Sequence, residues 1–149
     1  MLSVSVYVLG DKGRTVATAD YSAKQSDDVS LQICNKENLK GFVAGSKSDL
    51  FHFVPSGAVL FPDFYKAMLN YLEHSQRDYV VCPGLLITTD KKTVELRPDN
   101  KDFSFGQMIV KSWVVRELGD VSNLRHMSRR IISEYRGVEI PHCLYMEML

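Results

Sequence analysis

The sequence is poor in cysteine and has no excess charge of either sign. Its 149 residues include 18 Lys and Arg against 18 Asp and Glu. Domains that bind DNA or RNA usually carry a basic face or stripe, so this balance argues against a nucleic-acid partner. The cysteines are odd in number, widely spaced and without a C-x-x-C pair, which argues against a disulfide framework or a zinc site. We expect Cys34, Cys82 and Cys143 to be small buried side chains.

Long apolar runs, internal repeats and low-complexity linkers are also missing. No run approaches the roughly 18 to 20 residues that span a bilayer, and the first residues lack the charged leader of a secretory signal. We therefore expect a cytoplasmic protein without a membrane span. Domains of roughly 100 to 150 residues are common, so residues 1–149 are predicted to form one domain.

Short stretches with an apolar period of two predict strands. Residues 50–54 are instead almost continuously apolar, which suits a strand buried on both faces. Turn residues at 90–92 indicate that the strands on either side form a small hairpin insert. The predicted strands are 3–9, 29–34, 50–54, 79–82, 85–88 and 93–97, with a last short strand at 138–140.

Apolar residues spaced three and four apart predict helices. The strongest begins at Pro62, a residue suited to the first helical position, and runs to Ser75. A weak helix is expected at 19–24, a mostly helical segment at 105–118, and a helix from Asp120 or Ser122 to Tyr135. Together these elements predict an α/β fold with a central mixed, mostly parallel sheet and helices on both faces.

Several segments resemble a known family. They are VSVYVL, VSLQIC, GFVAGSKSDLFHFVPSGAVLFPDFYKAMLNYL, IVKSWVVRELGDVSN and SRRIISEYRGVEIP. In order and shape they are similar to GT-A fold glycosyltransferases of the large inverting family of bacterial polysaccharide and rhamnosyl transferases. The resemblance is one of pattern over most of the chain. It implies a Rossmann-related fold and a nucleotide-sugar donor bound where residues 8–11, 34–38 and 55–57 end the first three strands.

The chain departs from that family where the chemistry belongs. The family has an aspartate after the second strand that contacts the base, and this chain has Cys34-Asn35. The family also has an acidic D-x-D-like motif that binds Mn²⁺ or Mg²⁺, and this chain reads VPSGA at 54–58. Such cations need hard oxygen ligands, mainly carboxylates. We therefore expect no metal cofactor and no metal-dependent catalysis, unless the chain holds an acidic site that the pattern does not reveal.

The resemblance gives a set of candidate site residues. Arg125 and Arg129 share one helix face, and guanidinium groups suit a diphosphate, although a solvated helix face is the alternative. His126 stands where the family places an acidic base and is the candidate catalytic base, with a plain surface histidine as the alternative. The predicted nucleotide- or sugar-binding residues are Asp11, Asn35, Ser56, Gly57, Arg125 and Arg129.

Two further features bear on core and partners. His52 lies inside an apolar strand, so we expect a hydrogen-bonded core histidine rather than a ligand. The apolar end LYMEML is expected to pack against the domain or against a partner, which suggests a homo-oligomer. The leading hypothesis is a glycosyltransferase-like domain that binds a nucleotide sugar. Its alternatives are a non-enzymatic binding or assembly module on the same scaffold and an unrelated small α/β accessory protein.

Overall fold

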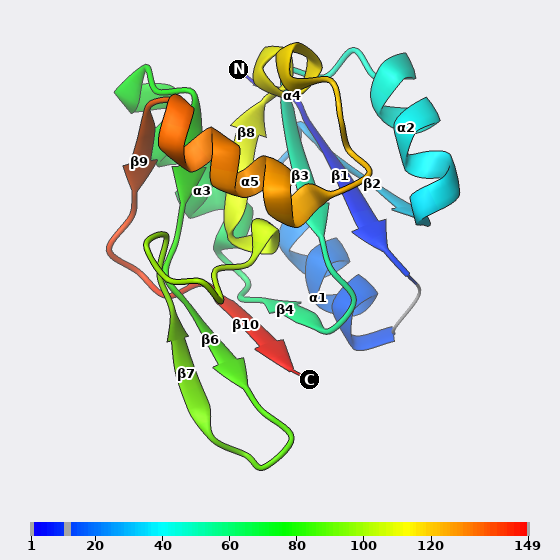
Figure 1. The fold of residues 1–149 in the computed structure, drawn as a ribbon. Coiled ribbons are helices and arrows are strands. Elements are labelled where there is room, and N and C mark those ends of the chain that lie inside the picture. Colours follow the sequence, from blue (N-terminus) through cyan, green and yellow to red (C-terminus); the bar gives the residue numbers. More distant parts are fainter. Residues whose placement is uncertain (1, 11–12, 149) are drawn as a thin grey trace.

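The computed structural model describes residues 2–10 and 13–148. In order across the larger of two sheets, its strands are β2 (Val29–Cys34), β1 (Val4–Leu9), β3 (Leu50–Val54), β8 (Met108–Lys111), β5 (Tyr79–Val81) and β9 (Gly137–Glu139) (Figure 1). Only β8 runs antiparallel to its neighbours in this sheet. The predicted mixed, mostly parallel sheet is therefore confirmed.

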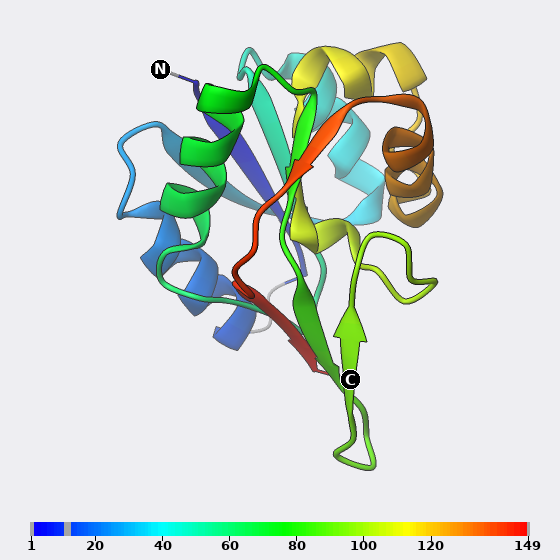
Figure 2. The same ribbon diagram turned by 90° about the vertical axis from the view of Figure 1, so that its left-hand side faces the viewer.

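Helices cover both faces of this sheet (Figure 2). One face carries α1 (Gly13–Ala23) and α3 (Phe64–Ser75), and the other carries α2 (Lys36–Gly45), α4 (Ser112–Leu118) and α5 (Leu124–Glu134). Each layer has its own apolar core, because side chains alternate along a strand. Along β1, for example, Val6 and Val8 face the α1 and α3 layer while Tyr7 faces α2.

A smaller sheet extends below the first. Its strands, in order, are β4 (Ala58–Leu60), β10 (Tyr145–Met148), β6 (Gly84–Ile87) and β7 (Thr93–Leu96). The antiparallel pair β6 and β7 confirms the predicted hairpin insert. The apolar end of the chain is β10, whose backbone pairs with both β4 and β6. It packs against the domain and does not form a free tail, so the reason for expecting self-association through it is removed.

Two segments differ from the sequence prediction. Residues 105–118 form a short 3₁₀ turn, η1 (Phe105–Gln107), then strand β8 and helix α4. A short apolar run buried on both faces has no period that separates strand from helix. The segment after β2, for which no helix is predicted from the sequence, is helix α2. Its start is fixed by a reciprocal cap between Asn35 and Asn38, and it buries Leu39 and Val43.

Other local predictions hold with shifted boundaries. The helix expected from Pro62 begins at Phe64, and the last helix begins after Asn123, which caps it through the His126 amide at 3.0 Å. Cys34 and Cys82 are buried as expected, whereas Cys143 is half-exposed. Within the part of the chain that the structure describes, no helix has the length and apolarity to cross a bilayer.

His52 is the core histidine that the sequence predicts. Its Nε2 lies 2.7 Å from the Gly106 carbonyl oxygen and its Nδ1 lies 2.7 Å from the Tyr65 hydroxyl. Because a carbonyl only accepts, Nε2 carries the proton and Nδ1 accepts from Tyr65. Burial lowers the pKa of His52 to about 4, against the opposing effect of its bond to Gly106. The neutral ring thus ties β3 and α3 to η1.

The first prediction concerns acid sensitivity. In the unfolded chain His52 binds a proton below pH 6.5, whereas in the folded chain it stays neutral down to about pH 4. Its contribution to stability is therefore complete above pH 6.5. As the pH falls from 6.5 to 4, that contribution is lost at about 1.4 kcal/mol per pH unit. Urea denaturation over this range measures it. His52→Gln should flatten this part of the profile, and the exposed His74→Gln control should keep it; an unchanged slope in His52→Gln contradicts the assignment.

The second prediction concerns the C-terminal strand. Tyr145 is fully buried between the two sheets, so Tyr145→Ala should lower the free energy of unfolding by about 3 to 5 kcal/mol. The matched control is Tyr21→Ala, because Tyr21 is 58% exposed. That variant should change stability by less than about 0.5 kcal/mol. Equal effects of the two substitutions in urea denaturation are incompatible with an internal β10.

Candidate functional site

The carboxyl ends of β1, β2 and β3 form the edge at which a ligand is expected. β1 pairs in parallel with β2 on one side and with β3 on the other, with Leu9 level with Cys34 and Val8 level with Val54. The connection after β1 leads to β2 on one side of it, and the connection after β2 leads to β3 on the other side of β1. In open α/β sheets such a switch point leaves a crevice outside the strand ends, where ligands bind.

The loops after β1 and β3 meet at this edge. Gly10 has a φ of +101°, a conformation that glycine adopts without strain. Its amide donates to the Cys34 carbonyl at 3.0 Å. A side chain at position 10 would lie 3.6 Å from the Cβ of Ser56, so these two loops are in contact range. Asp11, a predicted binding residue, lies outside the described residues.

Asn35 ends β2 and caps α2. Its side-chain oxygen accepts from the Asn38 amide at 3.0 Å, and the Asn38 side chain accepts from the Asn35 amide at 2.8 Å. The cap engages the carboxamide oxygen of Asn35, so a contact to a base would come from its N–H₂ group. Asn35 is exposed and directly follows the last residue of β2, and its role in binding stays a prediction.

Gly57 is held by the first helix and the last strand. Its amide donates to Thr15 Oγ1 at 3.2 Å, and its carbonyl accepts from the Met148 amide at 3.0 Å. A Cβ at position 57 would lie only 2.7 Å from the Met148 carbonyl oxygen, and φ is +98°. Close packing of β10 is therefore a structural reason for this glycine, while the predicted ligand contact is untested.

The same strand brings in a carboxylate that the sequence reasoning missed. Glu147 pairs with Ala58 across β10 and β4, beside the segment where the family carries its acidic motif. Its Oε1 accepts from the Ser104 hydroxyl at 2.8 Å and from the Tyr145 hydroxyl at 2.5 Å. Burial, followed by the charge of Glu147, raises the pKa of Tyr145 well above its usual value. The sequence held one signal for Glu147. Residues two apart in a strand point to the same face, so a strand at 145–148 would place Glu147 on the face of Tyr145.

These residues do not form the acidic site that a Mn²⁺ or Mg²⁺ ion needs. The segment 55–58 offers one hydroxyl and backbone carbonyls, and Glu147 adds a single carboxylate, whereas such ions take several oxygen ligands in a defined geometry. Across residues 2–10 and 13–148, no three His, Cys, Asp or Glu side chains gather as a metal-binding group. Among the described residues, the donors at this edge therefore do not fit the family's metal.

The remaining predicted residues lie on α5. Arg125 and Arg129 share one face, as predicted, and their Nη2 atoms donate to the Lys101 carbonyl at 2.9 and 2.6 Å. These two hydrogen bonds connect α5 to the loop that follows β7. His126 is exposed beside Asp120 and Arg130, along a hollow of about 140 Å³. Within the part of the chain that the structure describes, no hydrogen bond joins these side chains to Ser56 or Gly57, so the candidate residues form an edge group and an α5 group that no hydrogen bond connects.

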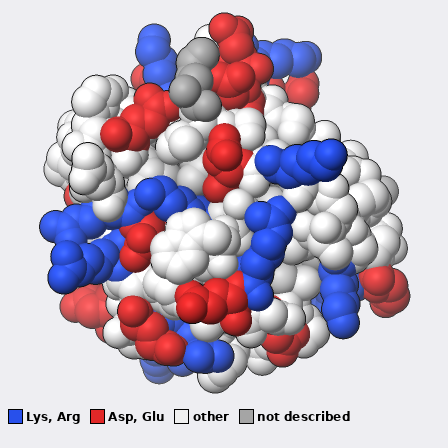
Figure 3. Space-filling view, turned by 90° about the horizontal axis from the view of Figure 1, so that it is seen from above, with Lys and Arg blue, Asp and Glu red and all other residues white. Residues whose placement is uncertain are grey.

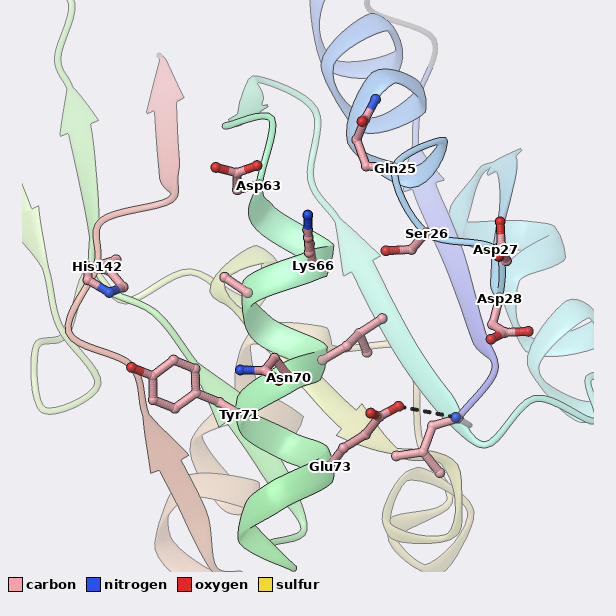
Figure 4. A pocket seen from close by; sticks show the side chains of 13 residues that line it. Gln25, Ser26, Asp27, Asp28, Asp63, Lys66, Asn70, Tyr71, Glu73 and His142 are labelled. Carbon is pink, nitrogen blue, oxygen red and sulfur yellow. Dashed lines mark hydrogen bonds between the residues drawn. The ribbon is translucent and has the colours of Figure 1, made fainter.

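A larger hollow lies away from both groups, between α3 and the loop that follows α1 (Figure 4). Its volume is about 640 Å³. None of the predicted site residues that the structure describes lines it. Its charged lining consists of Asp27, Asp28, Asp63, Lys66 and Glu73.

The surface seen from above carries interspersed acidic and basic side chains (Figure 3). A ligand on this face would meet no extended field of one sign. This is the face at which β1 begins, opposite the carboxyl edge of β1, β2 and β3 (Figures 1 and 3), so its charge pattern does not describe the candidate site.

Comparisons with known proteins identify the fold. No family model matches the chain, and no curated protein matches it. Among solved structures, the 1–349 fragment of S. aureus TarS in complex with UDP-GlcNAc superposes with a TM-score of 0.69 at 9% identity, covering 99% of this chain and 59% of that one. The same fragment in another crystal structure gives a TM-score of 0.67, again at 9% identity, and coverages of 99% and 60%.

A second protein has the same arrangement of elements. A197 from STIV superposes with a TM-score of 0.54 at 12% identity, covering 99% of this chain and 82% of that one. The chain spans about three fifths of the TarS fragment's length. TarS is a glycosyltransferase. The chain thus has a GT-A-like, glycosyltransferase-like α/β fold, related to the Rossmann fold.

Proposed function

We propose that the chain binds a nucleoside diphosphate sugar at the carboxyl edge of β1, β2 and β3. One observation carries the proposal: the switch point of the sheet lies in a fold shared over 99% of this chain with a TarS fragment solved in complex with UDP-GlcNAc. A uridine diphosphate sugar is therefore the first donor to test.

The edge offers donors suited to such a ligand. The Asn35 amide would contact the base at the end of β2. The first turn of α1 follows β1 and is tied to Gly57 through Thr15, and the unpaired N–H groups of a helix start attract phosphate. Arg125 and Arg129 are proposed to approach the diphosphate. Each guanidinium has five N–H donors and uses one of them on Lys101, so both keep donors for an anion.

Transfer of the sugar would place a further demand on the site. A base must take the proton of the acceptor hydroxyl while that oxygen attacks the anomeric carbon and the bond to the diphosphate breaks. His126 is the proposed base, because its side chain is exposed in the first turn of α5. No metal takes part in this proposal.

A binding or assembly module without catalysis is the second candidate. It is favoured by the packing of β10 on Gly57 and by the single carboxylate beside the segment 55–58. Both candidates share the scaffold. Donor binding separates a nucleotide-sugar-binding domain from an assembly module, and turnover of the bound donor separates a transferase from a binding module.

The third prediction is ligand stabilisation. UDP, UDP-GlcNAc and GDP- and dTDP-sugars are titrated by thermal shift with and without Mn²⁺. A uridine diphosphate donor at a hundredfold excess over its dissociation constant should add about 2.7 kcal/mol to the free energy of unfolding. The gain should be the same in both conditions, since the donor set does not fit the metal. Silence across all donors contradicts nucleotide-sugar binding and favours the assembly module, whereas a gain only with Mn²⁺ contradicts the metal-independent site.

The substitution Ser56→Glu tests whether the ligand binds at the edge formed by β1, β2 and β3. Ser56 is exposed there, and a carboxylate beside the diphosphate should weaken donor binding at least about tenfold through like-charge repulsion. The matched control is Thr93→Glu, at an exposed position of β7, the strand at the other side of the smaller sheet from β4, which should leave the affinity within about twofold. Equal affinity of the two variants in calorimetric titration places the ligand elsewhere.

A further inference from the structure

The outer edge of β2 has backbone groups that nothing else in the fold uses. β2 is the terminal strand of its sheet, and no strand among the described residues pairs with its outer side. Toward β1, the carbonyls of Asp28 and Cys34 accept from Val4 and Gly10. In a parallel ladder alternate residues bond to one neighbour, so positions 28 to 34 of even number serve β1. The N–H and C=O groups of Val29, Leu31 and Ile33 therefore point outward.

This edge also lacks the features that usually prevent pairing. Natural edge strands are commonly protected by charged residues, proline, bulges or a covering element. β2 reads VSLQIC, with neither charge nor proline, and pairs with β1 in unbroken register. Ile33 is 47% exposed, and with the half-buried Val29 and Leu31 it forms a row of apolar side chains along this edge strand. On the α2 side, a hollow of about 350 Å³ lies over Ser30 and Gln32, so α2 does not cover that face of the strand.

We propose that β2 pairs antiparallel with β2 of a second copy of this chain, about a two-fold axis at Leu31. The outward groups of 29, 31 and 33 allow this register, in which Leu31 faces its own counterpart and Val29 faces Ile33. These side chains form an apolar row on the α1 face, and Ser30 lies opposite Gln32 on the other face. The pairing buries Ile33 against an apolar neighbour and satisfies the outward backbone groups.

Charge favours a second copy over an unrelated strand. Asp28 precedes β2 and Lys36 follows it at the start of α2. Because the two strands run antiparallel, the start of one β2 lies beside the end of the other. The Asp28 end of one copy therefore faces the Lys36 end of its partner, and the two-fold symmetry repeats this pairing of opposite charges. The strand is therefore complementary to itself in hydrogen bonding, apolar pattern and charge.

The fourth prediction is a concentration-dependent dimer, measured on the full chain by sedimentation over a wide range of protein concentration. Leu31→Pro removes an outward N–H and leaves the bonds to β1 in place. Ile33→Lys puts a charge into the apolar row. Each should raise the dimer dissociation constant at least about tenfold. Trp113→Lys is the matched control, since Trp113 on α4 is 48% exposed, and it should leave the constant unchanged.

Hydrogen exchange gives a second readout that does not depend on a variant. The Leu31 and Ile33 amides should exchange more slowly as protein concentration rises, whereas those of Ser30 and Gln32, which bond to β1, should not respond. A monomer at every concentration overturns the proposal. So does a dimer that survives Ile33→Lys with its constant unchanged, because the contact is then on another surface, and so does concentration-independent exchange at Leu31.

Discussion

The parallel pairing of β1 with β2 and β3 is the constraint on which the rest of the structure depends. It brings three strand ends to one level and forces α1 and α2 onto opposite faces of the sheet. The loops after β1 and β3 contain Gly10 and Gly57, each with a positive φ that glycine adopts without strain. The candidate ligand contacts of the edge group lie here because the strand order changes direction at β1, which leaves a crevice outside the strand ends.

The C-terminal strand modifies that edge. β10 lies between β4 and β6 and approaches Gly57 so closely that a side chain there would meet backbone. It brings Glu147 beside Ala58 and holds its carboxylate with two hydroxyls. The chain therefore has a glycosyltransferase-like fold, and the described residues at this edge bring one carboxylate, Glu147, to the segment 55–58. Because one fold can host many functions, function must be argued from the residues at the edge.

Local pattern predicted much of this fold and less of its site. The alternation in β1 and β2 and the apolar run of β3 identified the central strands, because each signal lies within one element. β8 was missed because a strand buried on both faces has no alternation, and α2 because only Leu39 and Val43 mark its buried face. The position of Glu147 beside Ala58 could not be predicted, because it depends on the register of β10 against β4, two strands far apart in the sequence. The two arginines of α5 were correctly placed on one face, but their bond to Lys101 depends on a distant loop.

The central claim is that a nucleoside diphosphate sugar occupies the edge formed by β1, β2 and β3. The most direct test is backbone amide NMR during titration with UDP-GlcNAc, since each amide reports its own surroundings. The account predicts that the largest shifts fall on Gly10, Asn35 and Ser56, with saturation at one ligand per chain. Shifts confined to the hollow beside Asp63 and Lys66, or no saturable shifts at all, would contradict it.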